Sequence, residues 1–272
     1  MLVGYEDFNR TTRKGRDTGG TDHHLPTTII EMNAGTGLDY IEDTRETIRG
    51  SSGHALDIKT DDRNDASKLN VILVEGDQEC FFHLKQTVIK EWPSINFEEA
   101  IGSVETNRSG VYCLQRTPKE ALDLIEGIEL GNSLFFFDPL LFTPWEELER
   151  VASRRIKSYY ETRTEFIVFL FTTDWFIGRK KMVPLPKSIE ESTWNDKEKE
   201  TVRMMDDLFG NSLWQKEILT DDSIETRMDK LVQAYRVRLH RWFRYVLLLP
   251  FNPRLTRSTI FSCVLIMKEA FR

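Results

Sequence analysis

The sequence predicts an α/β fold built on a mostly parallel β-sheet. From Pro26 onward, short runs of apolar, β-branched or aromatic residues alternate with longer amphipathic segments. Strands joined by helical crossovers produce this alternation. The chain has 272 residues, of which 40% are hydrophobic, so it can bury the core of one large domain.

Seven strands are expected, with six helices between them. The strands are predicted at 28–33, 70–75, 111–115, 133–138, 165–172, 243–249 and 259–267, and the helices near 51–59, 77–91, 118–127, 144–158, 195–209 and 222–241. Only nine residues separate the last two strands, which is too short for a helical crossover and predicts an antiparallel last strand. A seven-stranded, mostly parallel sheet with an antiparallel last strand is the Rossmann-like pattern of class I methyltransferases.

Residues 1–26 are expected to form a flexible lead-in, because residues 9–26 are polar, carry paired glycines and show no periodicity. Residues 27–272 then form one domain. Two connections, 38–50 and about 174–224, are longer than a compact crossover needs, and the second is interpreted as a helical insertion over the sheet. The sequence has no run of about 20 apolar residues and no signal core, which predicts a cytoplasmic protein without a membrane span.

No metal site is expected. The three cysteines and five histidines are scattered along the chain without the paired spacing that zinc ligands show. Their odd number and wide separation also argue against a framework of disulfides. The cysteines are therefore interpreted as buried thiols.

The segment 27–40, TTIIEMNAGTGLDY, places an acid and two glycines after the first predicted strand. A dinucleotide-binding turn would need a third glycine at position 40, where the chain has Tyr40, and the Gly-Lys-Ser/Thr tripeptide of a Walker loop occurs nowhere in the sequence. Both of those loops bind phosphate, beside which the carboxylate of Glu31 would be unfavourable. The acid therefore indicates a ligand that is cationic at this position.

S-Adenosylmethionine is such a ligand, since it carries an ammonium group and a sulfonium. Glycines let the backbone approach its methionine part closely, and the residues predicted to hold that part are Glu31, Asn33, Ala34, Gly35 and Gly37. The ribose hydroxyls need a second carboxylate, which Glu75 provides after the next strand, with Asp77 as its substitute if the register differs. A plain strand-to-helix turn and a strand-end surface acid remain alternative interpretations.

A third acid, Asp138, follows the apolar run NSLFFF and is joined to Pro139. Open α/β sheets bind their ligand at the carboxyl edge, so both residues are predicted to face the substrate in a catalytic role. The sequence Asp-Pro-Pro-Tyr at this place is typical of methyltransferases that act on amino groups, whereas this chain has Leu140 and Leu141 in the last two positions. The alternative is a simple turn at the strand end.

Four segments, IIEMNAGTG, GSSGHAL, VILVEGD and FFFDPLL, resemble the three-Cys-motif partner family, a bacterial group related to class I methyltransferases. The resemblance covers about residues 28–172 and implies a methyltransferase fold, the cofactor named above and a partner protein encoded in the same operon. The chain departs from the family pattern at Ser52, where relatives have proline, at Leu140-Leu141, where they have an aromatic residue and glycine, and in its polar lead-in. These departures leave catalysis and the closure of the cofactor site open.

Charge is unevenly distributed along the chain. Residues 1–150 have 15 basic and 28 acidic side chains, a net charge of −13, whereas residues 151–272 have 22 and 16, a net charge of +6. A basic second half suits contact with nucleic acid, and the residues predicted to bind such a substrate are Arg179, Lys180 and Lys181. The helical segment 227–245 interleaves arginines with aromatics, which fits either phosphate contact with base stacking or an ordinary solvated amphipathic helix.

The sequence thus predicts an S-adenosylmethionine-dependent methyltransferase that acts on nucleic acid, with protein and small-molecule substrates left open. The main alternative is a catalytically inactive, methyltransferase-like interaction module in a bacterial operon or phage-defence system. A weaker alternative is an NAD-dependent oxidoreductase, which Tyr40 disfavours.

Overall fold

The structure is a computed structural model, and it describes residues 25–41, 44–61, 69–99, 109–139, 142–156, 164–171, 185–186, 188–219, 222–243, 245–251 and 262–268. Most of the predicted lead-in, residues 1–24, lies outside these ranges. Within them, no helix is both long and apolar enough to cross a bilayer.

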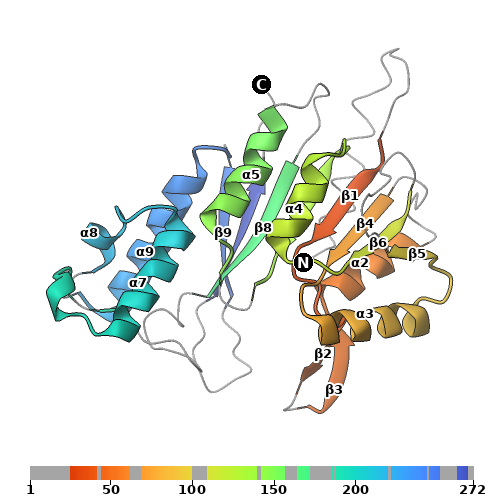
Figure 1. The fold of residues 1–272 in the computed structure, drawn as a ribbon, viewed down its shortest axis with the longest axis horizontal. Coiled ribbons are helices and arrows are strands. Elements are labelled where there is room, and N and C mark those ends of the chain that lie inside the picture. The colour runs from red at the N-terminus through yellow and green to blue at the C-terminus, as the bar shows by residue number, and fades with distance from the viewer. Residues whose placement is uncertain are drawn as a thin grey trace.

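A sheet of eight strands forms the framework of the described residues (Figure 1). The strands are β1 (Thr27–Glu31), β4 (Leu69–Val74), β5 (Phe97–Glu99), β6 (Val111–Leu114), β7 (Ser133–Phe137), β8 (Thr164–Phe171), β9 (Tyr245–Phe251) and β10 (Ser262–Lys268). Their order is β5-β6-β4-β1-β7-β8-β10-β9. Neighbours from β5 to β8 are parallel, whereas β10 is antiparallel to both β8 and β9. The parallel α/β sheet with a reversed last strand is therefore as predicted.

The predicted number of seven strands is wrong, because the main sheet of the described residues has eight. The extra strand, β5, has three residues, which is too short for a hydrophobic period to identify it. The long connection at 38–50 also contains regular structure. Strands β2 (Leu38–Ile41) and β3 (Glu46–Arg49) pair there as a separate antiparallel hairpin.

Helices cover both faces of the main sheet, as alternation along the strands requires. Ile29 of β1 lies in the core that includes α2 (Ser51–Thr60) and α3 (Gln78–Glu91). Its neighbour Ile30 lies in the opposite core, which includes α4 (Pro118–Glu126) and α5 (Trp145–Ile156). Apolar residues fill both faces of the central strands, which explains why the sequence shows continuous apolar runs at these places.

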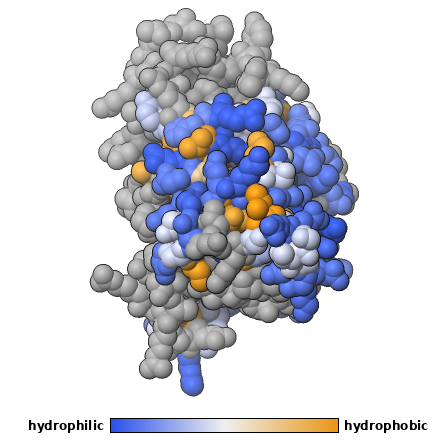
Figure 2. Space-filling view, turned by 90° about the vertical axis from the view of Figure 1, so that its left-hand side faces the viewer, coloured by the Kyte–Doolittle hydropathy of each residue, from blue (hydrophilic) through white to orange (hydrophobic). Residues whose placement is uncertain are grey.

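The predicted insertion contains the helices η2 (Glu191–Thr193), α7 (Asp196–Phe209) and α8 (Gln215–Ile218), followed by α9 (Ile224–Leu239). The buried side chains of α7 and α9 join the core of α4 and α5, and Figure 1 places these helices beside the β9 end of the sheet. Figure 2 views the molecule from that side and shows a mostly hydrophilic face with scattered apolar residues. The insertion thus extends one helical layer sideways.

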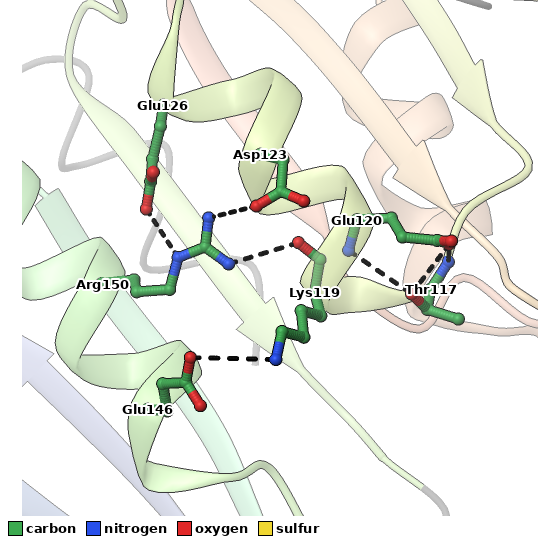
Figure 3. A network of polar contacts seen from close by, with 7 residues as sticks. All are labelled: Thr117, Lys119, Glu120, Asp123, Glu126, Glu146 and Arg150. Carbon is green, nitrogen blue, oxygen red and sulfur yellow. Dashed lines mark hydrogen bonds and ion pairs between the residues drawn. The ribbon is translucent and has the colours of Figure 1, made fainter.

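Arg150 ties α5 to α4 on the surface (Figure 3). Its guanidinium donates to Glu126 and Asp123, each at 2.7 Å, and to the carbonyl of Lys119 at 3.4 Å. One cation shared by two carboxylates is a network with fixed geometry, which stabilises more than an isolated surface pair does. Because α4 precedes β7 and α5 follows it, this network holds the two helices that flank β7 along the chain.

Helix α9 is the predicted helix with interleaved arginines and aromatics, and several of these side chains have structural contacts. Arg227 is only 3% exposed and donates to the carbonyls of Ile218 at 2.9 Å and Pro186 at 2.7 Å. Tyr235 is fully buried, and the Arg238 guanidinium lies 4.2 Å from the ring centroid of Trp145. The amphipathic-helix interpretation therefore fits these three residues better than phosphate contact and base stacking.

We expect Arg227→Met to lower the free energy of unfolding by about 2–3 kcal/mol, because it leaves two buried carbonyls without their charged donor. Urea denaturation followed by circular dichroism measures this loss. The matched control is Arg236→Met on the same helix, at a partly exposed position, for which we expect a change within about 0.5 kcal/mol. Equal effects of the two substitutions would contradict the assignment of Arg227 to the core.

Candidate functional site

Three predicted acids follow three adjacent parallel strands at one edge of the sheet. Glu31 ends β1, Glu75 comes directly after β4, and Asp138 comes directly after β7. Strand β1 pairs with β4 on one side and with β7 on the other, with Glu31 opposite Leu73 and Phe136. The carboxyl ends of neighbouring parallel strands meet at the same edge, so the pairing alone brings the three acids to one place.

Glu31 is the most deeply buried acid of this edge. Its side chain is 1% exposed, and Oε1 has no hydrogen-bond partner among the residues that the structure describes. Burial raises the pKa of Glu31 well above its ordinary value, and the nearby carboxylates of Asp138 and Asp39 raise it further, while a hydrogen bond from Ser51 lowers it. A buried carboxylate oxygen without a donor is costly, so a cation or a hydrogen-bond donor that reached Oε1 would remove this cost.

The turn after β1 leaves room for a ligand against its backbone. Gly35 has φ +58° and Gly37 has φ +81°, values in the left-handed region that favours glycine. A Cβ built on Gly35 would have no heavy atom of the described residues within 4 Å, whereas one built on Gly37 would lie 3.3 Å from Leu84 Cδ1. Gly35 therefore faces open space and Gly37 faces the protein.

Helix α2 and strand β4 hold this turn in place. The Ser52 hydroxyl donates to the carbonyl of Ala34 at 2.7 Å, and the Gly50 amide donates to the carbonyl of Gly37 at 3.1 Å. The amide of Ala34 donates to Val74 of β4 at 2.8 Å. Ser52, a departure from the family pattern, thus contributes a hydrogen bond that proline could not make.

Glu75 joins the turn to the end of β4. Its Oε2 accepts from the Gly35 amide and its Oε1 from the Asp77 amide, each at 2.8 Å. Each carboxylate oxygen retains a second acceptor site, so Glu75 can also accept from ligand hydroxyls. Asp77 instead caps α3 by accepting from the Cys80 amide at 2.8 Å, and this bond lowers the pKa of Asp77. Glu75 is therefore better placed than its predicted substitute.

Asp138 lies at the same edge and is half-buried. Burial raises its pKa to about 6, with a further contribution from Asp39. Pro139 is buried, and Asn33 is partly exposed in the turn after β1. Leu140 and Leu141, which replace the expected proline and aromatic residue, lie outside the described residues.

The predicted substrate-binding residues are not described by the structure, and one residue near the site was not predicted. Arg179, Lys180 and Lys181 lie outside the described residues. Asp39, by contrast, was not predicted as a site residue, yet it acts on the pKa values of both Glu31 and Asp138. Asp39 lies on strand β2 of the hairpin β2–β3. Its proximity to Glu31 and Asp138 could have been predicted only by recognising that residues 38–41 pair with residues 46–49.

No family model and no curated protein matches this sequence. Several solved structures are similar. Trm1 of Pyrococcus horikoshii, solved with S-adenosyl-L-methionine, is 11% identical to this chain, with a TM-score of 0.45. The alignment covers 90% of this chain and 51% of the Trm1 chain. A Legionella pneumophila protein is 12% identical (TM-score 0.41, coverage 96% and 81%), and a Streptococcus thermophilus rRNA methylase is 9% identical (TM-score 0.37, coverage 91% and 90%). These likenesses are distant, so the fold assignment rests on the observed strand order, and membership of the three-Cys-motif partner family stays a hypothesis.

We expect Glu31→Gln to make the protein more stable than wild type at neutral and alkaline pH. The raised pKa means that folding disfavours the ionised carboxylate, so wild-type stability falls as pH rises from the unfolded pKa through the folded one. Below about pH 4 the side chain at position 31 is neutral in wild type as well as in the variant, so the difference in stability between the two proteins disappears. Urea denaturation between about pH 4 and pH 8 measures the difference, expected to reach on the order of 1 kcal/mol.

The matched control for this pH series is Glu200→Gln, at an exposed position of α7. We expect its effect on stability to stay constant across the same range. An advantage of Glu31→Gln that is independent of pH, or that shrinks as pH rises, would contradict the burial of an ionisable group at the end of β1.

Proposed function

We propose that this protein is an S-adenosylmethionine-dependent methyltransferase. The observation that carries the proposal is the buried Oε1 of Glu31, which has no partner among the described residues, in the strand that leads into a turn whose Gly35 faces open space in the described part of the chain. Such a site suits a ligand with a positive charge and a chain that lies against backbone. The order of the sheet, in which β10 runs antiparallel between β8 and β9, is the class I methyltransferase arrangement and supports the same function.

The described residues fit the chemical groups of this cofactor one by one. Glu31 would accept from the ammonium group of the methionine part, and the open side of Gly35 leaves room for its backbone atoms. Glu75, on the neighbouring strand β4, would accept from the ribose hydroxyls. Asp138 lies on the other side of β1, so it would face the atom that receives the methyl group.

When bound, S-adenosylmethionine supplies an electrophilic methyl group. The protein then has to align an acceptor atom with that group, which is largely a matter of positioning. Because its pKa is about 6, Asp138 is mostly ionised at neutral pH and can accept a hydrogen bond or proton from an acceptor N–H or O–H. Glu31 and Glu75 would hold the cofactor, Glu31 from the end of β1 and Glu75 from the end of β4.

Binding of NAD is disfavoured at this site. A dinucleotide-binding turn continues directly into a helix whose N-terminus faces the pyrophosphate. Here the hairpin β2–β3 intervenes between the turn and α2, and Asp39 Oδ2 lies 3.2 Å from where a Cβ on Gly50, the N-cap of α2, would be. A carboxylate at that helix end opposes a phosphate.

We expect wild-type protein to bind S-adenosylmethionine and S-adenosylhomocysteine, and not NAD, in isothermal titration calorimetry. Glu31→Gln and Glu75→Gln should each weaken S-adenosylmethionine at least about 10-fold, because each removes a charge-assisted hydrogen bond worth roughly 1.5–3 kcal/mol. The matched control is Glu79→Gln at an exposed position in the first turn of α3, expected to bind as wild type. The proposal fails if wild type binds neither sulfur compound.

The finer proposal is that the methyl acceptor belongs to a nucleic acid. It is supported by the net charge of +6 in residues 151–272. Within α9, Arg227 and Arg238 have structural contacts, so the segment with Arg179, Lys180 and Lys181 is the better candidate for phosphate contact.

We expect the triple change of Arg179, Lys180 and Lys181 to Glu to abolish salt-sensitive binding of RNA or DNA, measured by filter binding at about 50 mM and about 200 mM salt. Transfer of a tritiated methyl group to pooled RNA and DNA should fall in parallel. Cofactor affinity serves as the control and should not change. Wild type that retains no polynucleotide at low salt would exclude this substrate, and bound cofactor without any methyl transfer would favour the inactive interaction module.

A further inference from the structure

Three carboxylates of the candidate site lie at graded depth. Glu31 is buried, Asp138 is half-buried and Asp39 is exposed. Glu31 and Asp138 come from the edge of the main sheet, whereas Asp39 comes from the second residue of the hairpin strand β2. A group of carboxylates alone is not a ligand site, but Oε1 of the buried Glu31 has no partner among the described residues, so this oxygen can accept from another molecule.

Contacts of the backbone connect Asp39 to Glu31. Asp39 Oδ2 lies 3.2 Å from the Cβ position of Gly50, whose amide donates to the carbonyl of Gly37. The next residue, Ser51, donates a hydrogen bond to Glu31. The Asp39 carboxylate therefore lies close to Gly50, the N-cap of α2 and the residue before Ser51.

Asp39 also acts electrostatically on both other acids. Its charge contributes to the raised pKa of Glu31 and to that of Asp138. Because the negative charge of Asp39 acts on both Glu31 and Asp138, it also acts on a ligand group that lies between these two residues. In the proposed function, the sulfonium would lie there, because Glu31 would hold the ammonium group and Asp138 would meet the acceptor of the methyl group.

We infer that Asp39 makes the site selective for the charged cofactor over its uncharged product. S-Adenosylmethionine has a positive sulfonium, whereas S-adenosylhomocysteine has a neutral thioether and is otherwise the same molecule. A carboxylate near the sulfur therefore stabilises the first and not the second. This selectivity favours exchange of product for fresh cofactor. The inference rests on the proposed function and gives the hairpin β2–β3 a role in it.

The test measures the affinities of both compounds for wild type and for Asp39→Asn by isothermal titration calorimetry. We expect wild type to prefer S-adenosylmethionine and the variant to lose about 2- to 5-fold of that preference, since Asp39 is exposed and its field is partly screened by solvent. The affinity for S-adenosylhomocysteine should stay the same or rise. At about 1 M salt the preference of wild type should fall towards that of the variant.

The control is Glu46→Gln, which removes one negative charge from the opposite end of the same hairpin, where Glu46 pairs with Ile41. It should leave the preference unchanged. If Asp39 serves only the N-terminus of α2, Asp39→Asn will lower the free energy of unfolding without altering the ratio of affinities, and the inference is overturned. Failure of wild type to bind either compound would instead reject the proposed function itself.

Discussion

The pairing of β1 with β4 on one side and β7 on the other is the constraint on which the candidate site depends. It places the ends of three parallel strands side by side, and each strand end supplies an acid. Glu75 then holds the glycine turn in place by accepting a hydrogen bond from the Gly35 amide. Ser52 of α2 also holds this turn, by donating to the carbonyl of Ala34. The geometry of the site is therefore a property of the sheet and its first crossover, and the distant insertion serves mainly to extend one core.

The buried carboxyl group of Glu31 lowers the stability of the fold, but it offers a contact for a cationic ligand. Burial of a carboxylate without a donor for Oε1 opposes folding, and the apolar residues of β1 on both faces, such as Ile29 and Ile30, supply the stabilisation that offsets it. A cation that reaches Glu31 converts this unfavourable group into a favourable contact. Binding of a cationic ligand should therefore stabilise the fold in addition to occupying the site.

Much of the fold could be predicted from the sequence because the central strands are apolar on both faces and the helices carry a clear amphipathic period. The positions of Glu31, Glu75 and Asp138 at one edge of the sheet could be predicted for the same reason, since each lies at the end of an apolar strand. Asp39 could not, because its place depends on the pairing of two short, exposed strands. The burial of Arg227 could not be predicted either, because a pattern of charges does not reveal that a guanidinium is buried and donates to backbone carbonyls.

The acidic edge restricts how a nucleic acid could be methylated here. Asp39 and Asp138 repel phosphates at the place where the methyl group would be transferred, so a polynucleotide backbone would have to lie away from them, against basic residues of the second half. The acceptor base must then extend from that backbone into the edge, which is easiest for an unpaired or flipped nucleotide. The negative first half and the positive second half of the chain are thus compatible with one substrate that contacts both.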